Sequence, residues 1–113
     1  MTKGHEHHTR AGSWQIRQIQ AVDTDPMFSG VEYTFSVESD ELGFEVQVTF
    51  APIFYHLASL RHRVRLPETA RGLVTRLLDH GVATAASIHV GSDGVAKHAG
   101  RVLAKLLPLH RGR

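Results

Sequence analysis

The sequence predicts a two-layer α+β fold, in which an antiparallel sheet with an N-terminal β-meander or hairpin carries two or three helices packed on one face. Two segments in which apolar and polar residues alternate predict the hairpin, and three segments with helical spacing predict the helices. Of the 113 residues, 42 % are hydrophobic and 21 % charged, as in an ordinary globular domain. We expect one α+β domain over residues 14–108, a disordered tail over residues 1–13 and a basic C-terminal tail over residues 109–113.

Residues 14–22, WQIRQIQAV, predict the first strand. Its apolar positions change phase between Ile16 and Ile19, and a β-bulge or an edge position in the sheet explains such a change. The turn cluster DTDPMFSG follows and separates this strand from the next.

Residues 31–38 and 44–50 are the clearest strands. Their alternating apolar residues, which we expect in the core, are Val31, Tyr33, Phe35 and Val37 in the first and Phe44, Val46, Val48 and Phe50 in the second. The polar residues between them face water. Residues 39–43, SDELG, supply a five-residue connection, so the two strands form a hairpin.

Residues 52–62 predict a helix that begins at Pro52, because apolar residues follow at spacings of four, three and four. A strand over residues 59–66 is the alternative, since apolar residues and His62 alternate there with arginines. Both patterns are present, so the periodicity leaves this choice open.

Residues 67–80 have the strongest helical pattern. Glu68 in the first turn, and His80 followed by Gly81 at the end, are typical of helix termini. The apolar stripe that we expect in the core consists of Ala70, Leu73, Val74, Leu77 and Leu78.

Residues 82–90, VATAASIHV, predict a short strand with Ala86, Ile88 and Val90 on one side. Residues 93–107 then predict the last helix, which begins in the GSDG loop and ends before Pro108. Its expected core stripe consists of Val95, Ala99, Val102, Leu103 and Leu106.

Charge is distributed unevenly along the chain. Three basic and eight acidic residues precede His56, whereas ten basic and three acidic residues follow, so the two halves carry formal charges of −5 and +7. A basic half is typical of contact with an anionic surface, of which nucleic acid is the usual one. All eight aromatic residues lie in the acidic half, which favours phosphate contact over base stacking.

Arg61, Arg63 and Arg65 are the first group of candidate anion-binding residues. With the helix that follows, they are similar over about twenty residues to the strand and first helix of ribbon-helix-helix repressors. The next segment, VATAASIHVG, lacks the pattern expected of that family's second helix, so the similarity assigns no family.

Lys97, Arg101 and Lys105 are the second group. On the expected last helix they stand at i, i+4 and i+8 and line one side, where they would contact successive phosphates. Small residues beside them would let another backbone approach closely.

His89 is the histidine best placed for a functional role, because it points away from Ile88 and Val90 beside the GSDG loop. A small enzyme built around His89 ranks last among the functions considered, since no carboxylate stands in a recognised spacing to orient the ring. The chain has no cysteine and no spacing typical of a metal site, so we expect no metal, no cofactor and no catalytic residue.

The sequence therefore favours a small non-enzymatic regulatory or accessory binding protein whose basic C-terminal half contacts nucleic acid. The alternative is a protein–protein interaction module in which acidic and basic surfaces complement each other. Such a module would be a homo-oligomer, for example a homodimer, or an inhibitor or adaptor that binds an acidic protein surface. No segment approaches the roughly 20 apolar residues that cross a bilayer, and cysteine is absent, so we expect a cytoplasmic protein without a membrane partner.

Overall fold

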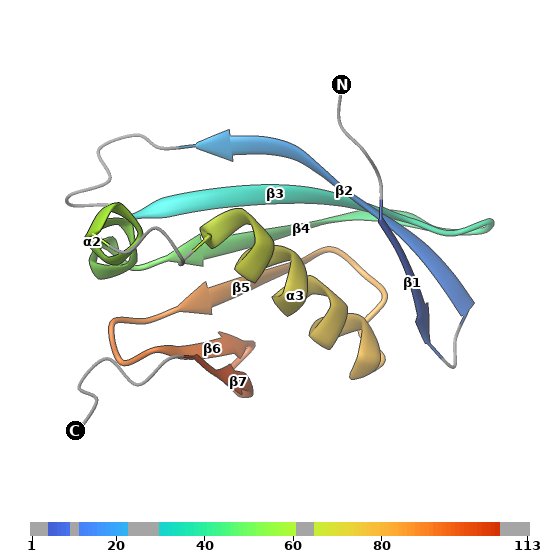
Figure 1. Cartoon of the computed structure of the whole chain (residues 1–113). Helices are drawn as coiled ribbons and strands as arrows, with labels where there is room; N and C mark the ends of the chain where they lie inside the picture. The colour runs from blue at the N-terminus through green and yellow to red at the C-terminus, as the bar shows by residue number, and fades with distance from the viewer. Residues whose placement is uncertain (1–4, 10–11, 23–29, 61–64, 107–113) are drawn as a thin grey trace.

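The computed structural model describes residues 5–9, 12–22, 30–60 and 65–106, which form a mostly β-sheet protein (Figure 1). Seven strands lie in one sheet in the order in which they occur in the chain. They are β1 (His5–Thr9), β2 (Gly12–Val22), β3 (Val31–Glu38), β4 (Gly43–Phe50), β5 (Ala86–Val90), β6 (Val95–His98) and β7 (Arg101–Lys105). The sheet curls into a half-barrel, and helix α3 (Leu66–Asp79) lies across its concave face (Figure 1).

Neighbouring strands pair antiparallel except β4 and β5, which run parallel. A parallel pair needs a crossover connection, which here contains α2 (Pro52–Leu60) and α3. The helix predicted over residues 52–62 is α2. The alternative prediction is a strand over residues 59–66. Residues 61–64 of this segment lie outside the described residues, and Leu66 belongs to α3. Neither helix in the described part of the chain is long and apolar enough to cross a lipid bilayer.

The prediction of a two-layer α+β fold with two or three helices on one face is wrong. Residues 93–107, expected to form the last helix, contain the antiparallel strands β6 and β7 instead. Helix α2 has nine residues, so α3 is the one long helix of the described residues. The sheet dominates the fold, which is a curled β half-barrel with α3 in its concave side.

The turn between β6 and β7 explains why this segment is a hairpin. Ala99 and Gly100 both have positive φ, 51° and 80°, as in a two-residue type I′ turn, and this backbone cannot continue a helix. The register then shifts by one residue at Leu103, which is a β-bulge. The bulge places Leu103 and Ala104 on the inner side and leaves Val102 45 % exposed. Apolar residues therefore fall at spacings that imitate a helix.

The predicted hairpin is confirmed as β3 and β4, which pair antiparallel over their whole lengths. All of its predicted core residues are buried, except for the half-buried Phe44. The phase change predicted for the first strand is also a bulge, because the register of β2 against β3 shifts between Gln18 and Gln20. This shift leaves Ile19 46 % exposed.

The hydrophobic core lies between the concave face of the sheet and α3. The whole apolar stripe predicted for residues 67–80 is buried and packs against the inward residues of the central strands. Among the largest fully buried side chains are Phe35, Phe50, Ile16, Leu77 and Ile88. Burial of this apolar surface is the main force that holds helix and sheet together.

Arg71 ties the polar side of α3 to the sheet. Its Nη1 donates a hydrogen bond to the main-chain oxygen of Ile16 at 2.8 Å, and its guanidinium lies 5.4 Å from the centre of the Phe35 ring. Burial lowers the pKa of Arg71, and the carboxylate of Glu68 opposes this effect.

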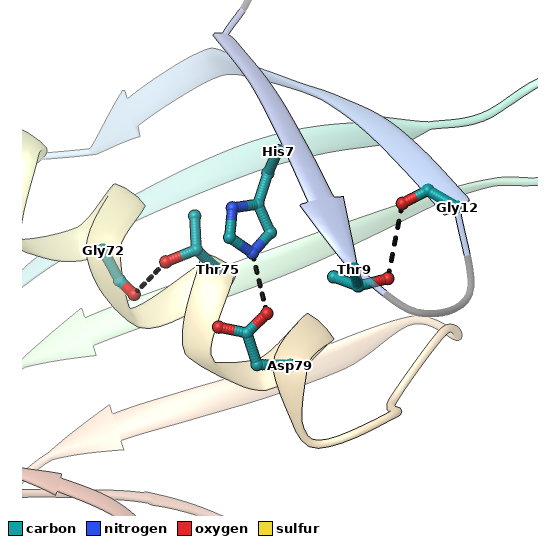
Figure 2. Close-up of polar contacts among 6 residues, drawn as sticks. All are labelled: His7, Thr9, Gly12, Gly72, Thr75 and Asp79. Atoms are coloured by element: carbon teal, nitrogen blue, oxygen red, sulfur yellow. Dashed lines mark hydrogen bonds and ion pairs between the residues drawn. The ribbon is translucent and has the colours of Figure 1, made fainter.

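Strand β1 lies within residues 1–13, the segment predicted as a disordered tail, and pairs with β2 at all five of its positions. Figure 2 shows that β1 also contacts α3, since Nε2 of His7 lies 2.8 Å from Oδ1 of Asp79 in the last turn of the helix. The strand therefore extends the half-barrel over the C-terminal end of α3 (Figure 1).

Candidate anion-binding surface

The outer face of the sheet, which is the face turned away from α3, carries the polar residues that alternate with the core. In β4 and β5 these are Glu45, Gln47, Thr49, Ser87 and His89. Val48 and Ile88 are fully buried on the opposite face. Successive side chains of a strand point to opposite faces, so this alternation places the exposed residues on the outer side.

The second group of predicted cations lies on the β6–β7 hairpin, and all three side chains are exposed. By the pairing of the two strands, Lys97 and Lys105 share the outer face, whereas Arg101 pairs with His98 beside the turn and projects to the other side. The helical stripe predicted for these cations is therefore wrong. The structure brings Lys97 and Lys105 together on one face, without Arg101.

His89 stands next to these lysines. It is exposed on the outer face of β5, between the buried Ile88 and Val90, and lies in register with Lys97 of β6. Because neighbouring strands are about 4.8 Å apart, the two side chains are neighbours. We call His89, Lys97 and Lys105 the outer basic patch.

The cations of the β6–β7 hairpin are unpaired within the part of the chain that the structure describes. Among the described residues, none of the three cations takes part in an ion pair, whereas Arg17 on β2 lies 3.9 Å from Glu38. The one acidic residue in the sequence between positions 86 and 106 is Asp93. Its Oδ1 accepts a hydrogen bond from the main-chain N of Val95 at 3.0 Å. The positive charge of the hairpin is therefore available to an anion.

The first group of predicted cations is described only in part, because Arg61 and Arg63 lie outside the described residues. Arg65 is the N-cap residue of α3, and its exposed guanidinium lies 3.5 Å from Oε2 of Glu68. Helix α3 covers the inner side of the sheet (Figure 1). The structure therefore does not bring Arg65 together with the outer basic patch.

A shallow, open depression adjoins the patch where β6 ends before its neighbour β5 does. The two strands pair at only two positions, so Ser87 of β5 has no partner in β6. The imidazole of His98 spans the gap, and its Nδ1 donates a hydrogen bond to the main-chain oxygen of Ser87 at 3.2 Å. The polar side chains that line the depression are Glu45, Gln47, Ser87, His89 and His98.

Sequence analysis missed this depression and singled out only His89 among its residues. Strand alternation places Glu45 and Gln47 on the outer face, but it does not show which strand lies beside them. Their neighbour, β5, follows only after the whole α2–α3 crossover. The early end of β6 depends on the turn at Ala99–Gly100, which lay inside the expected helix.

The surface presents cations, one carboxylate and several uncharged polar side chains. The described residues include no group of three or more histidine or acidic side chains placed to hold a metal ion. Within the same residues, His89 forms no hydrogen bond to a carboxylate or a hydroxyl group, the contact through which a catalytic histidine is oriented. The depression offers hydrogen-bond donors and acceptors, and the patch beside it offers positive charge.

Strand β7 lies at one end of the sheet among the described strands, and edge strands can pair with another chain. Arg101, Lys105 and the bulge at Leu103 are features that protect such edges. The cations of β7 thus have a structural explanation in addition to anion binding.

Comparison of the chain with known protein families, curated proteins and solved structures finds no match.

Proposed function

We propose that this chain is a non-enzymatic binding domain that contacts nucleic acid through the outer basic patch. The observation that carries the proposal is the arrangement of Lys97 and Lys105, which are exposed on one face of a hairpin and have no acidic partner among the described residues. His89 beside Lys97 adds a ring that can form a hydrogen bond to a ligand.

Phosphate groups are the anions that suit this patch best. Lysine ammonium groups are point charges on flexible side chains, and they reach phosphate oxygens whatever the base sequence. Glu32, Glu38 and Glu45 occupy the outer positions of β3 and β4. These carboxylates repel phosphate groups, so the phosphate contacts are expected on β5, β6 and β7.

The double variant Lys97→Gln/Lys105→Gln tests the proposal. Both side chains are exposed, so the fold should be retained while two phosphate contacts are lost. We expect weaker binding to every single-stranded and duplex oligonucleotide, measured by fluorescence anisotropy. The slope of log affinity against log salt should fall by up to about two, because each lost contact contributes about 0.7 to 0.9.

Arg17→Gln is the matched control, because it removes an exposed cation from the outer face of β2 that already lies beside Glu38. This variant should bind as the unchanged protein does. If the unchanged protein binds neither single-stranded nor duplex nucleic acid at about 50 mM salt, where phosphate contacts are strong, the proposal is wrong.

Self-association is a second candidate, favoured by the distribution of charge on the outer face. Glu32 and Glu45 lie on β3 and β4, and the lysines lie on the other side of β5. Two copies related by a twofold axis near β5 would place the acidic side of each opposite the basic side of the other. Light scattering tests this candidate: a dimer at low salt should dissociate at high salt and be lost in Lys97→Gln/Lys105→Gln.

A further inference from the structure

We infer that the depression beside the outer basic patch binds one unstacked nucleobase, preferentially guanine, so that the partner is a single-stranded nucleic acid. The inference rests on the proposed function and names the substrate class for the same surface. Its basis is the contrast between the patch, which is basic, and the depression, which contains a carboxylate and several uncharged polar groups.

At the gap between β5 and β6, main-chain N–H and C=O groups of β5 have no partner strand in the described part of the chain. In a continuous sheet these groups would bond to the neighbouring strand. The N–H and C=O groups of one strand residue point to the same side. Since the oxygen of Ser87 accepts from His98, the N–H of Ser87 also faces the gap, where no residue of β6 is in register with it. In the neutral imidazole of His98, Nδ1 is the donor, so Nε2 is an acceptor. The depression thus presents both a donor and an acceptor from fixed positions.

Glu45 decides what kind of group fits the depression. A phosphate would be repelled by its carboxylate, whereas an uncharged ring with N–H groups would donate hydrogen bonds to it. Gln47 and the Ser87 hydroxyl both donate and accept, which suits the mixed edge of a nucleobase. The lysines of the patch lie outside this polar lining and remain free to contact the phosphates on either side of the bound base.

Guanine matches the carboxylate best because it carries two adjacent N–H donors on its Watson–Crick edge. The two oxygens of Glu45 can accept from both, whereas thymine and uracil offer one N–H between two carbonyl oxygens that a carboxylate repels. This edge is already paired in a duplex, so the base has to be single-stranded. His89, exposed at the side of the depression, presents a ring on which a base can stack, although the basic half has no phenylalanine, tyrosine or tryptophan.

The test uses three ligands. They are a short oligothymidine, the same oligomer carrying one central guanine, and the duplex form of that guanine-containing oligomer. Affinities are measured by fluorescence anisotropy at about 50 mM salt, where phosphate contacts hold all ligands on the patch. We expect the unchanged protein to bind the guanine-containing single strand at least about fivefold more tightly than oligothymidine, as one bidentate base contact provides. It should also bind this single strand more tightly than the duplex.

Glu45→Gln should reduce the preference for guanine to less than about twofold, because one of the two acceptors becomes an amide. Glu32→Gln is the matched control, since it removes the same charge from the outer face of β3, outside the depression. Both variants should bind oligothymidine somewhat more tightly, so the ratio of the two affinities is the decisive quantity. The control should keep the ratio of the unchanged protein.

The failures of the two proposals give different results. Equal affinity of the unchanged protein for both single strands, or a ratio that Glu45→Gln leaves unchanged, overturns the base site while the phosphate-binding function stands. Tighter binding of the duplex than of the single strand also overturns it. No binding to any of the oligonucleotides overturns the proposed function and the base site together.

Discussion

Replacing Gly30 with alanine tests how closely the start of β3 approaches the end of β4. A Cβ atom at residue 30 would lie 2.0 Å from the main-chain oxygen of Phe50, far inside van der Waals contact, and φ at this glycine is 87°. Left-handed backbone costs an L-residue about 1 to 2 kcal/mol, and overpacking adds about 1 to 3 kcal/mol. We therefore expect Gly30→Ala to lower the free energy of unfolding by about 2 to 5 kcal/mol.

Gly81→Ala is the matched control, because Gly81 has a φ of 85° but no atom within 4 Å of its added Cβ. It should cost only the backbone contribution of about 1 to 2 kcal/mol. Urea unfolding followed by the fluorescence of Trp14, the single tryptophan and 4 % exposed, measures both variants. Equal costs for the two substitutions would refute the close approach of β3 to Phe50.

Two further predictions concern the β6–β7 hairpin. Leu103 is 4 % exposed, so Leu103→Ala should lower the free energy of unfolding by about 2 to 5 kcal/mol, as large-to-small core changes do. Val102 is 45 % exposed, so Val102→Ala should lower it by less than about 1 kcal/mol. Similar costs in urea unfolding would contradict the bulge. Ala99→Asn should raise the melting temperature, because asparagine adopts positive φ more readily than alanine and Asn-Gly is a preferred type I′ pair. A lower melting temperature would contradict the assigned turn.

The elements that could be predicted from the sequence are those whose signal is local. Each strand of the β3–β4 hairpin shows its buried face through its own alternation, and α3 shows its face through helical spacing over 14 residues. The end of α3 also has a local signal, since the main-chain N of Gly81 donates a hydrogen bond to the oxygen of Leu78 beyond the last turn. The phase change before Ile19 is also a local signal, and of its two explanations, a bulge or an edge position, the register shift between Gln18 and Gln20 shows the bulge.

The β6–β7 hairpin could not be predicted because two local irregularities conceal it. Its turn contains Ala99, a residue that usually favours helices, and the bulge at Leu103 breaks the alternation by which a strand is recognised. Strand β1 has a different difficulty. HEHHT contains no large apolar residue, so its only signal is the edge of β2 to which it binds.

Of the candidate surface, only His89 and the lysines are named from the sequence, and their arrangement could not be predicted. His89 follows from its place between Ile88 and Val90, and Lys97 was named from a helix that does not exist. The approach of Glu45 and Gln47 to Ser87 is a tertiary property, because it depends on which two strands meet across the crossover. Pairing of this kind leaves no trace in the periodicity of either strand.

The strands lie in the sheet in the same order as in the chain, and this order affects how the protein folds. Every pairing except β4 with β5 joins strands that follow each other directly along the chain, and such pairs close quickly because little chain entropy is lost. The β4–β5 junction has to wait for the crossover to fold back, so β1–β4 and β5–β7 are expected to form as two separate units first. The depression lies on that junction, with Glu45 and Gln47 on one unit and Ser87 and His89 on the other. A partly folded chain would therefore present its lysines before it presents the depression. Under the proposed function, such a chain would bind polyanions without distinguishing one base from another.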